Sequence, residues 1–158
     1  YYYNVLLLGG FSKTYAMTGR RIGYAAGPKD IISEMIKLQQ YTFVCAPSFA
    51  QKAVLKAIEY DMSDFVTSYA TKRDIIYEGL KDQFKLEKPL GAFYAFPILP
   101  EGGNVNDFVE QAIKNKVLII PGNDFSEKNY GFRISFASPN DNLKKGVEIL
   151  NNLAKELF

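Results

Sequence analysis

The chain has 158 residues, of which 47% are hydrophobic and 23% are charged, a composition typical of a globular protein. Its formal net charge is only +2 and its basic residues never occur in runs longer than two, which argues against a nucleic-acid-binding protein. The sequence contains no histidine, so Ser-His-Asp catalysis, Cys-His catalysis and histidine-ligated metal sites are excluded. Its longest apolar runs are far too short to cross a membrane, and we expect no membrane partner.

Cys45 is the only cysteine, so no disulfide can form within the chain. We interpret it as a small buried residue rather than a nucleophile. The cysteine content suits a reducing compartment, and we expect a cytoplasmic protein. The chain opens with YYYNVLLL and has no initiator methionine, so we expect it to be part of a longer protein.

The first part of the chain is expected to contain two strands and then two helices. Continuous apolar runs at residues 4–8 and 21–26, each closed by glycine, predict strands that are covered on both faces. A loop with the sequence Ser-Lys-Thr lies between them. Hydrophobic periodicity predicts helices over residues 27–41 and 45–60.

Both of these helices carry signals for a capped start and an apolar face. Pro28 and Asp30 open the first helix, while Ser48 is the expected N-cap of the second and Gln51 completes a capping box. The expected apolar residues are Ile31, Ile32, Met35, Ile36 and Leu38 on the first helix and Ala50, Val54, Leu55 and Ile58 on the second.

The remaining sequence alternates in a way typical of a two-layer α/β domain. A long helix is expected from Asp61 to about Phe84. A strand, a helix, two strands and a final helix follow, at residues 91–99, 104–116, 117–121, 130–137 and 140–157. The expected inward residues are Phe65, Tyr69, Ile76 and Leu80 on the long helix and Phe108, Val109, Ala112 and Ile113 on the next one. We place the boundary near residue 60, which divides the chain into residues 1–60 and 61–158.

Lys13 is the first candidate for chemistry. It follows an apolar strand and a Gly-Gly turn, so we expect its amine at the carboxyl end of a strand, where open α/β sheets bind ligands. The alternative is an ordinary surface lysine, and the glycine spacing of a phosphate-binding P-loop is not met. Ser12 and Arg21 could bind a phosphate nearby, because arginine holds phosphate through two parallel hydrogen bonds. The amine of Lys13 could act as a nucleophile toward an aldehyde. The combination therefore indicates a ligand with both a phosphate and an aldehyde, such as pyridoxal phosphate.

The stretch GFSKTYAMTGRRIGY, residues 10–24, resembles the lysine signature of the class I/II aminotransferases, which are fold-type-I pyridoxal-phosphate enzymes. Further segments are similar to the same family. They are APSFAQKAVLKAI, GAFYAFP, IIPGNDF and FRISFA, at residues 46–58, 91–97, 119–125 and 132–137. The resemblance covers essentially the whole chain, as the C-terminal portion of a longer enzyme.

The resemblance implies an α/β fold in two parts. Residues 1–60 would be the end of the large pyridoxal-phosphate-binding domain, and residues 61–158 a small two-layer α/β C-terminal domain. Lys13 would hold pyridoxal 5'-phosphate covalently and then move the α-proton of the substrate as acid and base. Ser12 and Arg21 would bind the cofactor phosphate, and Arg133 would hold the substrate α-carboxylate through a two-pronged salt bridge.

Other positions have weaker implications. Arg20 stands where many relatives have tryptophan, and Gly10 where some have a second phosphate-binding serine. Tyr15 either lines the cofactor pocket or packs beneath the loop. Tyr94 is expected in the core, and Asn123 could approach the substrate through its backbone.

By resemblance the protein would be an aminotransferase that acts on an amino acid and a 2-oxo acid as a homodimer, with residues 39–49 near the partner subunit. Residues that contact the pyridine ring would come from upstream, so we expect the isolated chain to be inactive or nearly so. We also expect its apolar segment 4–8 to be exposed and to cause self-association. The alternatives are a pyridoxal-phosphate-dependent lyase of the same fold, a non-catalytic cofactor- or effector-binding module of a regulator, and a small domain with a vestigial signature.

Overall fold

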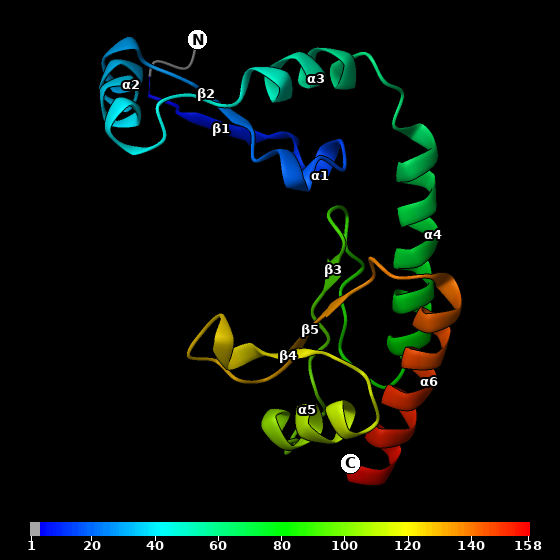
Figure 1. Ribbon diagram of the computed structural model, residues 1–158. Helices are drawn as coiled ribbons and strands as arrows, with labels where there is room; N and C mark the ends of the chain where they lie inside the picture. The colour runs from blue at the N-terminus through cyan, green and yellow to red at the C-terminus, as the bar shows by residue number, and fades with distance from the viewer. Residues whose placement is uncertain (1–3) are drawn as a thin grey trace. The chain divides into compact units, whose positions relative to one another are not determined.

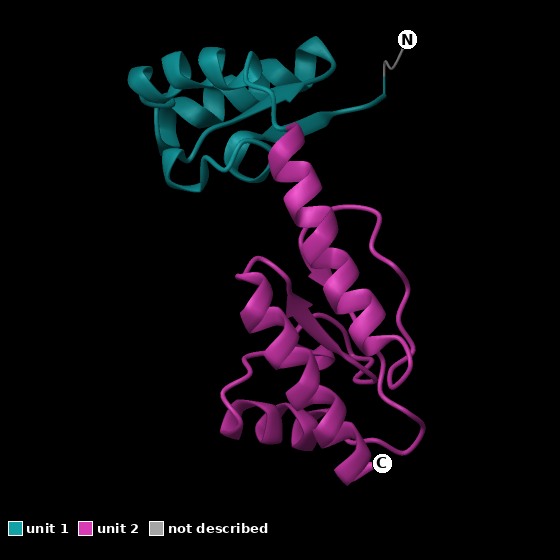
Figure 2. Ribbon diagram, turned by 90° about the vertical axis from the view of Figure 1, so that its right-hand side faces the viewer, with its two compact units in different colours: residues 1–62 teal, residues 63–158 magenta. Residues whose placement is uncertain are grey.

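The computed structural model describes residues 4–158 and divides the chain into two compact units. The first unit ends at Met62, and the second runs from Ser63 to Phe158 (Figure 2). The division falls two residues after the boundary expected from the sequence. The mixed α/β fold class is confirmed, while the assignment of the units to a cofactor-binding domain and a small domain stays a prediction.

The first unit is built on an antiparallel hairpin (Figure 1). Its strands are β1 (Leu7–Gly10) and β2 (Gly23–Ala26), paired from Leu7 with Ala26 to Gly10 with Gly23. The connection contains the one-turn helix α1 (Phe11–Thr14) and the 3₁₀ turn η1 (Thr18–Arg20). Helices α2 (Lys29–Thr42) and α3 (Ser48–Ile58) follow.

The prediction that both strands are covered on two faces is wrong for this chain. Leu7 is 53% exposed and Leu8 66% exposed, because β1 and β2 pair only with each other among the described residues. The expected exposure of segment 4–8 is therefore confirmed for its apolar residues. Helix α2 likewise buries none of its residues. On α3, Ala50 and Val54 are buried as predicted, whereas Leu55 and Ile58 are exposed.

The predicted capping of α3 is also wrong. Ser48 is the first helical residue, Pro47 occupies the N-cap, and no side chain caps the helix. Gln51 reaches back instead, and its side-chain nitrogen donates to the carbonyl oxygen of Ala46 at 2.7 Å. Cys45, which we expected to be buried, is exposed in the loop before α3.

The second unit has the predicted order of strand, helix, two strands and helix after a long helix (Figure 1). Its elements are α4 (Ser63–Leu80), β3 (Tyr94–Ala95), α5 (Val105–Lys114), β4 (Ile120–Pro121), η2 (Gly122–Asp124), β5 (Phe132–Ser135) and α6 (Asn140–Leu157). The sheet order is β3-β5-β4, and both pairings are antiparallel. The side chain of Asn104 caps α5 by accepting from the backbone N–H groups of Asn106 and Asp107.

Aromatic rings fill the core of the second unit between the sheet and the helices. Phe84, Phe108 and Phe132 are each at most 2% exposed, and their ring centroids lie 5.3 to 5.6 Å apart. Ile76 and Leu80 of α4 are buried against them as predicted, but Phe65 and Ile113 are exposed. Burial of these large aromatic side chains, together with the aliphatic residues around them, stabilises the unit.

Helices α4 and α6 lie side by side and cross at a glycine (Figure 1). A Cβ on Gly79 would lie 2.5 Å from Cγ1 of Val147, so this close approach requires glycine. The side-chain nitrogen of Asn151 donates to the carbonyl oxygen of Gly79 at 2.8 Å, which links the two helices at the same place. None of the helices in the described part of the chain is both long and apolar enough to cross a membrane.

Candidate functional site

The loop between β1 and β2 carries three of the predicted site residues. Its two ends are joined by a hydrogen bond of 3.4 Å from the backbone N–H of Phe11 to the carbonyl oxygen of Ile22, which extends the hairpin pairing. Ser12 follows Phe11, and Arg21 precedes Ile22. The structure therefore brings the backbones of Ser12 and Arg21 to the same end of the hairpin, with Lys13 one residue further on.

Helix α1 is a single turn that holds Ser12 and Lys13. It is closed by a hydrogen bond of 3.2 Å from the Tyr15 N–H to the Phe11 carbonyl. The Phe11 ring lies 5.9 Å from the Tyr15 ring and 5.6 Å from the Tyr24 ring, so aromatic packing fixes the turn against β2. Tyr15 thus packs against Phe11, and its role in lining the cofactor pocket stays untested.

Two residues of this loop have left-handed backbone conformations. Ala16 has a φ of 53° and Arg21 a φ of 50°. Residues other than glycine pay about 1 kcal/mol or more for this conformation, and such residues gather at ligand-binding sites. The guanidinium of Arg21 donates to the carbonyl oxygen of Thr18 at 3.3 Å, so the arginine folds over its own loop.

The charged residues in the sequence of this hairpin and its flanks are all basic. Lys13, Arg20, Arg21 and Lys29 are the charged residues of the first 29 positions, and the first acidic residue of the chain is Asp30. Lys13 and Arg21 are exposed, and Ser12 is half-buried. Two cations and a hydroxyl at one loop, with no carboxylate nearby in sequence, make a surface that fits an anion such as a phosphate.

The sequence suggested no role for Arg20, and the structure shows that it contacts an aromatic ring. Its guanidinium lies over the ring of Phe49 in α3, 5.7 Å from the ring centroid. A planar guanidinium can stack on an aromatic face as a ring does. Arg20 therefore connects the loop to α3 through packing.

Arg133 lies on β5 of the second unit, where burial alternates along the strand. Phe132 and Ile134 are buried among the helices, at 0% and 6% exposure, so Arg133 faces the other side of the sheet. Its guanidinium lies over two aromatic rings, 4.5 Å from the centroid of Tyr94 and 4.6 Å from that of Phe125. Arg133 is thus a half-buried arginine held by rings.

The expectation that Tyr94 belongs to the core is wrong. Tyr94 is 39% exposed, because it pairs with Ser135 and so shares the sheet face of Arg133 rather than that of the helices. Phe125 was missed by the sequence analysis, although it ends the segment IIPGNDF that carried part of the resemblance. Asn123, two residues earlier, is exposed in η2.

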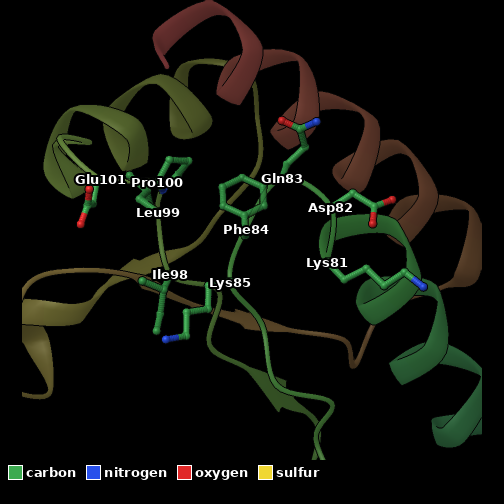
Figure 3. A pocket seen from close by; sticks show the side chains of 9 residues that line it. All are labelled: Lys81, Asp82, Gln83, Phe84, Lys85, Ile98, Leu99, Pro100 and Glu101. Atoms are coloured by element: carbon green, nitrogen blue, oxygen red, sulfur yellow. The ribbon is translucent and has the colours of Figure 1, made fainter.

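A hollow of about 740 Å³ lies in the first unit beside the β1–β2 loop, and its lining residues are Phe11, Ile22, Gly23, Gln39, Cys45, Ala46, Ser48, Gln51, Lys52, Val54 and Leu55. Another of about 540 Å³ lies in the second unit at the end of α4, and its lining residues are Lys81, Asp82, Gln83, Phe84, Lys85, Ile98, Leu99, Pro100 and Glu101 (Figure 3). The charged groups of Lys81 and Glu101 lie on opposite sides of it. Lys85 and Ile98, which both line it, are joined by two backbone hydrogen bonds. Nothing there converges on a ligand. The loop of the first unit thus borders a hollow, whereas Arg133 lines neither of these two hollows.

Comparison with known proteins identifies the family. Residues 1–150 match the family described as aminotransferase class I and II. The chain belongs to this family. It is 43% identical, over an alignment of 163 residues, to a probable aspartate aminotransferase of Methanocaldococcus jannaschii. That alignment covers 97% of this chain and 42% of the relative.

Solved aminotransferases share the fold. An aromatic aminotransferase from Pyrococcus horikoshii superposes with a TM-score of 0.89 at 33% identity, over 96% of this chain and 43% of that one. An aspartate aminotransferase from Thermotoga maritima gives a TM-score of 0.88 at 32% identity, over 95% and 40% of the two chains. The chain thus spans about two fifths of the length of the relatives that it matches.

Class I and II aminotransferases depend on pyridoxal 5'-phosphate, so the family and cofactor predictions are confirmed. The β1–β2 loop of this aminotransferase chain fits the phosphate of that cofactor, because its strained backbone presents Arg21 and Ser12 at one end of an acid-free hairpin. The individual roles of Ser12, Lys13, Arg21 and Arg133 stay predictions.

Proposed function

We propose that this chain supplies the catalytic lysine and two binding arginines of a pyridoxal-phosphate-dependent aminotransferase, which moves an amino group between an amino acid and a 2-oxo acid. The observation that carries the proposal is the hairpin loop. In this loop Ser12, Lys13 and Arg21 lie at one end of a strand pair, and its sequence resembles the lysine signature of the family.

Ser12 and Arg21 would bind the cofactor phosphate. Arg21 would offer two parallel N–H donors. Ser12 would add one hydroxyl donor from the same end of the hairpin. The left-handed backbone of Arg21 supports this role, since such strain is retained where a loop must aim a side chain.

Lys13 would perform the proton transfer. Bound pyridoxal phosphate supplies an electron sink that stabilises negative charge at the substrate α-carbon. The amine of Lys13 would take the proton from that carbon as a base and deliver it again as an acid. Its location on a single helical turn, fixed through Phe11 against β2, supports a well-defined position for this amine.

Arg133 would hold the α-carboxylate of the substrate. A guanidinium binds a planar carboxylate through two parallel hydrogen bonds, which fixes orientation as well as position. Because relatives are named aspartate aminotransferase and aromatic-amino-acid aminotransferase, we propose L-aspartate and the aromatic amino acids as the first substrates to assay, with 2-oxoglutarate as acceptor.

The complete enzyme would need more than this chain. The chain spans about two fifths of its relatives, and the groups that hold the pyridine ring would lie in the remaining length. We propose that the complete enzyme is a cytoplasmic homodimer and that the 158-residue chain alone does not turn over substrate. The exposed apolar surfaces of β1 and α2 support a requirement for further protein around the first unit.

The test compares the complete protein with three variants. Lys13→Ala should abolish transamination. It should also abolish the covalent attachment of the cofactor that borohydride reduction makes permanent and that peptide mass spectrometry detects. Arg21→Ala should weaken cofactor binding. Lys29→Ala is the control: it changes an exposed lysine at the start of α2 and should alter neither transamination nor cofactor binding. Full activity of Lys13→Ala would contradict the proposal, as would release of ammonia or a thiol without formation of the amino acid of the acceptor.

A further inference from the structure

Arg133 and the two rings beneath its guanidinium form a local arrangement that the family comparison does not assign. We propose that Tyr94 and Phe125, here called the aromatic clamp, are positioning residues that hold the Arg133 guanidinium in the orientation that binds a substrate carboxylate. This inference rests on the proposed role of Arg133.

The two rings reach Arg133 from different elements. Tyr94 lies on β3 and pairs with Ser135, two residues along β5 from Arg133, so the two side chains are diagonal neighbours on one sheet face. Phe125 lies at the end of η2, where its N–H donates to the carbonyl oxygen of Gly122 at 3.0 Å. The centroid distances of 4.5 and 4.6 Å place both rings in cation–π contact with the guanidinium.

The clamp leaves the hydrogen-bonding capacity of Arg133 available. Contact with a ring face uses the charge of the guanidinium and none of its N–H donors. Arg73, another half-buried arginine of the same unit, lies 2.8 Å from the carboxylate of Asp74. Among the described residues, no ion pair of Arg133 is found. Aromatic rather than carboxylate neighbours keep Arg133 oriented without occupying it, which suits a carboxylate-binding role.

The rings are poorly explained as core residues. Tyr94 is 39% exposed and Phe125 is 51% exposed, while the buried core of the unit lies on the opposite face of the sheet. Phe93 contacts Tyr94 at 4.4 Å between ring centroids and fixes its ring from the side. An arginine side chain otherwise loses much rotamer freedom when it binds a ligand. A guanidinium that is already held in place loses less of this freedom on binding, so its affinity for the carboxylate is higher.

Steady-state kinetics of the complete enzyme test the clamp. With the amino acid that it turns over best, Tyr94→Leu and Phe125→Leu should each raise KM for that amino acid about tenfold and leave kcat within about twofold. Tyr94→Phe should stay within about twofold of wild type, because it keeps the ring. Tyr130→Leu is the matched control, since Tyr130 is 48% exposed in the same unit and contacts Phe96 instead of Arg133. In an Arg133→Leu background, Tyr94→Leu should have no further effect.

The outcomes separate the two proposals. If Arg133→Leu leaves KM unchanged, the proposed function of Arg133 fails. If Arg133→Leu raises KM while Tyr94→Leu and Phe125→Leu do not, the clamp is overturned and the function of Arg133 stands.

Discussion

The backbone N–H of Phe11 donates to the carbonyl oxygen of Ile22 at 3.4 Å, and this hydrogen bond joins the two ends of the loop that carries Lys13 and Arg21. The next pair of the hairpin, Gly10 with Gly23, allows the strands to approach closely. A Cβ on Gly23 would lie only 2.7 Å from the carbonyl oxygen of Gly9. The geometry of the proposed phosphate site thus depends on a residue without a side chain.

Gly23→Ala should therefore weaken cofactor binding. The added methyl group would push the strands apart at the base of the loop, and the cost of such backbone clashes is about 1 to 3 kcal/mol. In the complete enzyme we expect a rise of about tenfold in the Kd for pyridoxal phosphate, measured by absorbance titration. Gly19→Ala is the control, because a Cβ on Gly19 meets nothing within 4 Å. Equal affinities for the two variants would contradict this account of the loop.

Arg21→Lys should weaken cofactor binding although it keeps the charge. Lysine presents a single ammonium group and cannot make the two parallel hydrogen bonds of a guanidinium with a phosphate. We expect the Kd to rise about tenfold, with a smaller change for Arg20→Lys, since Arg20 contacts the Phe49 ring. A larger effect at Arg20 than at Arg21 would show that the phosphate arginine has been misassigned.

Local sequence patterns predicted the order of the elements and much of the core of the second unit. The period of 3.6 residues identified Phe108, Val109 and Ala112 as inward residues of α5, and all three are buried. Predictions of burial failed where a residue's burial depends on other parts of the protein packing over its helix. Leu55 has the helical spacing of a core residue and is 65% exposed, because periodicity defines an apolar face without supplying the protein that covers it.

The candidate site was predicted as a set of residues but not as a geometry. The lysine signature is a local motif, so Ser12, Lys13 and Arg21 could be selected from sequence alone. The neighbours of Arg133 could not, because the face of Tyr94 is set by its register with β5 and the position of Phe125 by the turn η2. Both depend on contacts between distant segments, which a single sequence does not encode in any local pattern.

Gly79→Ala should destabilise the second unit. Its Cβ would lie 2.5 Å from Cγ1 of Val147, whose branched side chain has little freedom to move, so we expect a loss of about 1 to 3 kcal/mol in the free energy of unfolding. Urea denaturation followed by circular dichroism measures this loss. Val147→Ala should recover part of it in the double variant. Gly146→Ala should instead stabilise α6 by up to about 1 kcal/mol, since its Cβ meets nothing within 4 Å.

Asp74 should make the stability of the second unit depend on pH in the acid range. Hydrogen bonds from Arg73, and then from Lys88, lower the pKa of its carboxyl from 3.8 to about 2. A carboxyl whose pKa is lower in the folded state stabilises the fold above its unfolded pKa, and this contribution is lost as the pH falls from about 4 to about 2. The urea midpoint of Asp74→Asn should therefore be lower than that of wild type at pH 6, and the difference should shrink toward pH 2. Glu127→Gln is the control, because it makes the same kind of change at an exposed carboxylate.

The isolated chain should self-associate through its first unit. The side chains of Leu7 and Leu8 are 53% and 66% exposed on a strand whose outer edge is unpaired among the described residues, and such edges template pairing with another chain. Sedimentation velocity of the 158-residue chain should show a mass that rises with concentration. Leu8→Lys should shift the distribution toward the monomer, because a charge on an exposed strand opposes edge-to-edge pairing. Leu90→Lys alters a side chain that is 99% exposed in a loop and should leave the distribution unchanged. A wild-type chain that stays monomeric at all concentrations, or an equal response to the two lysine substitutions, would count against association through β1.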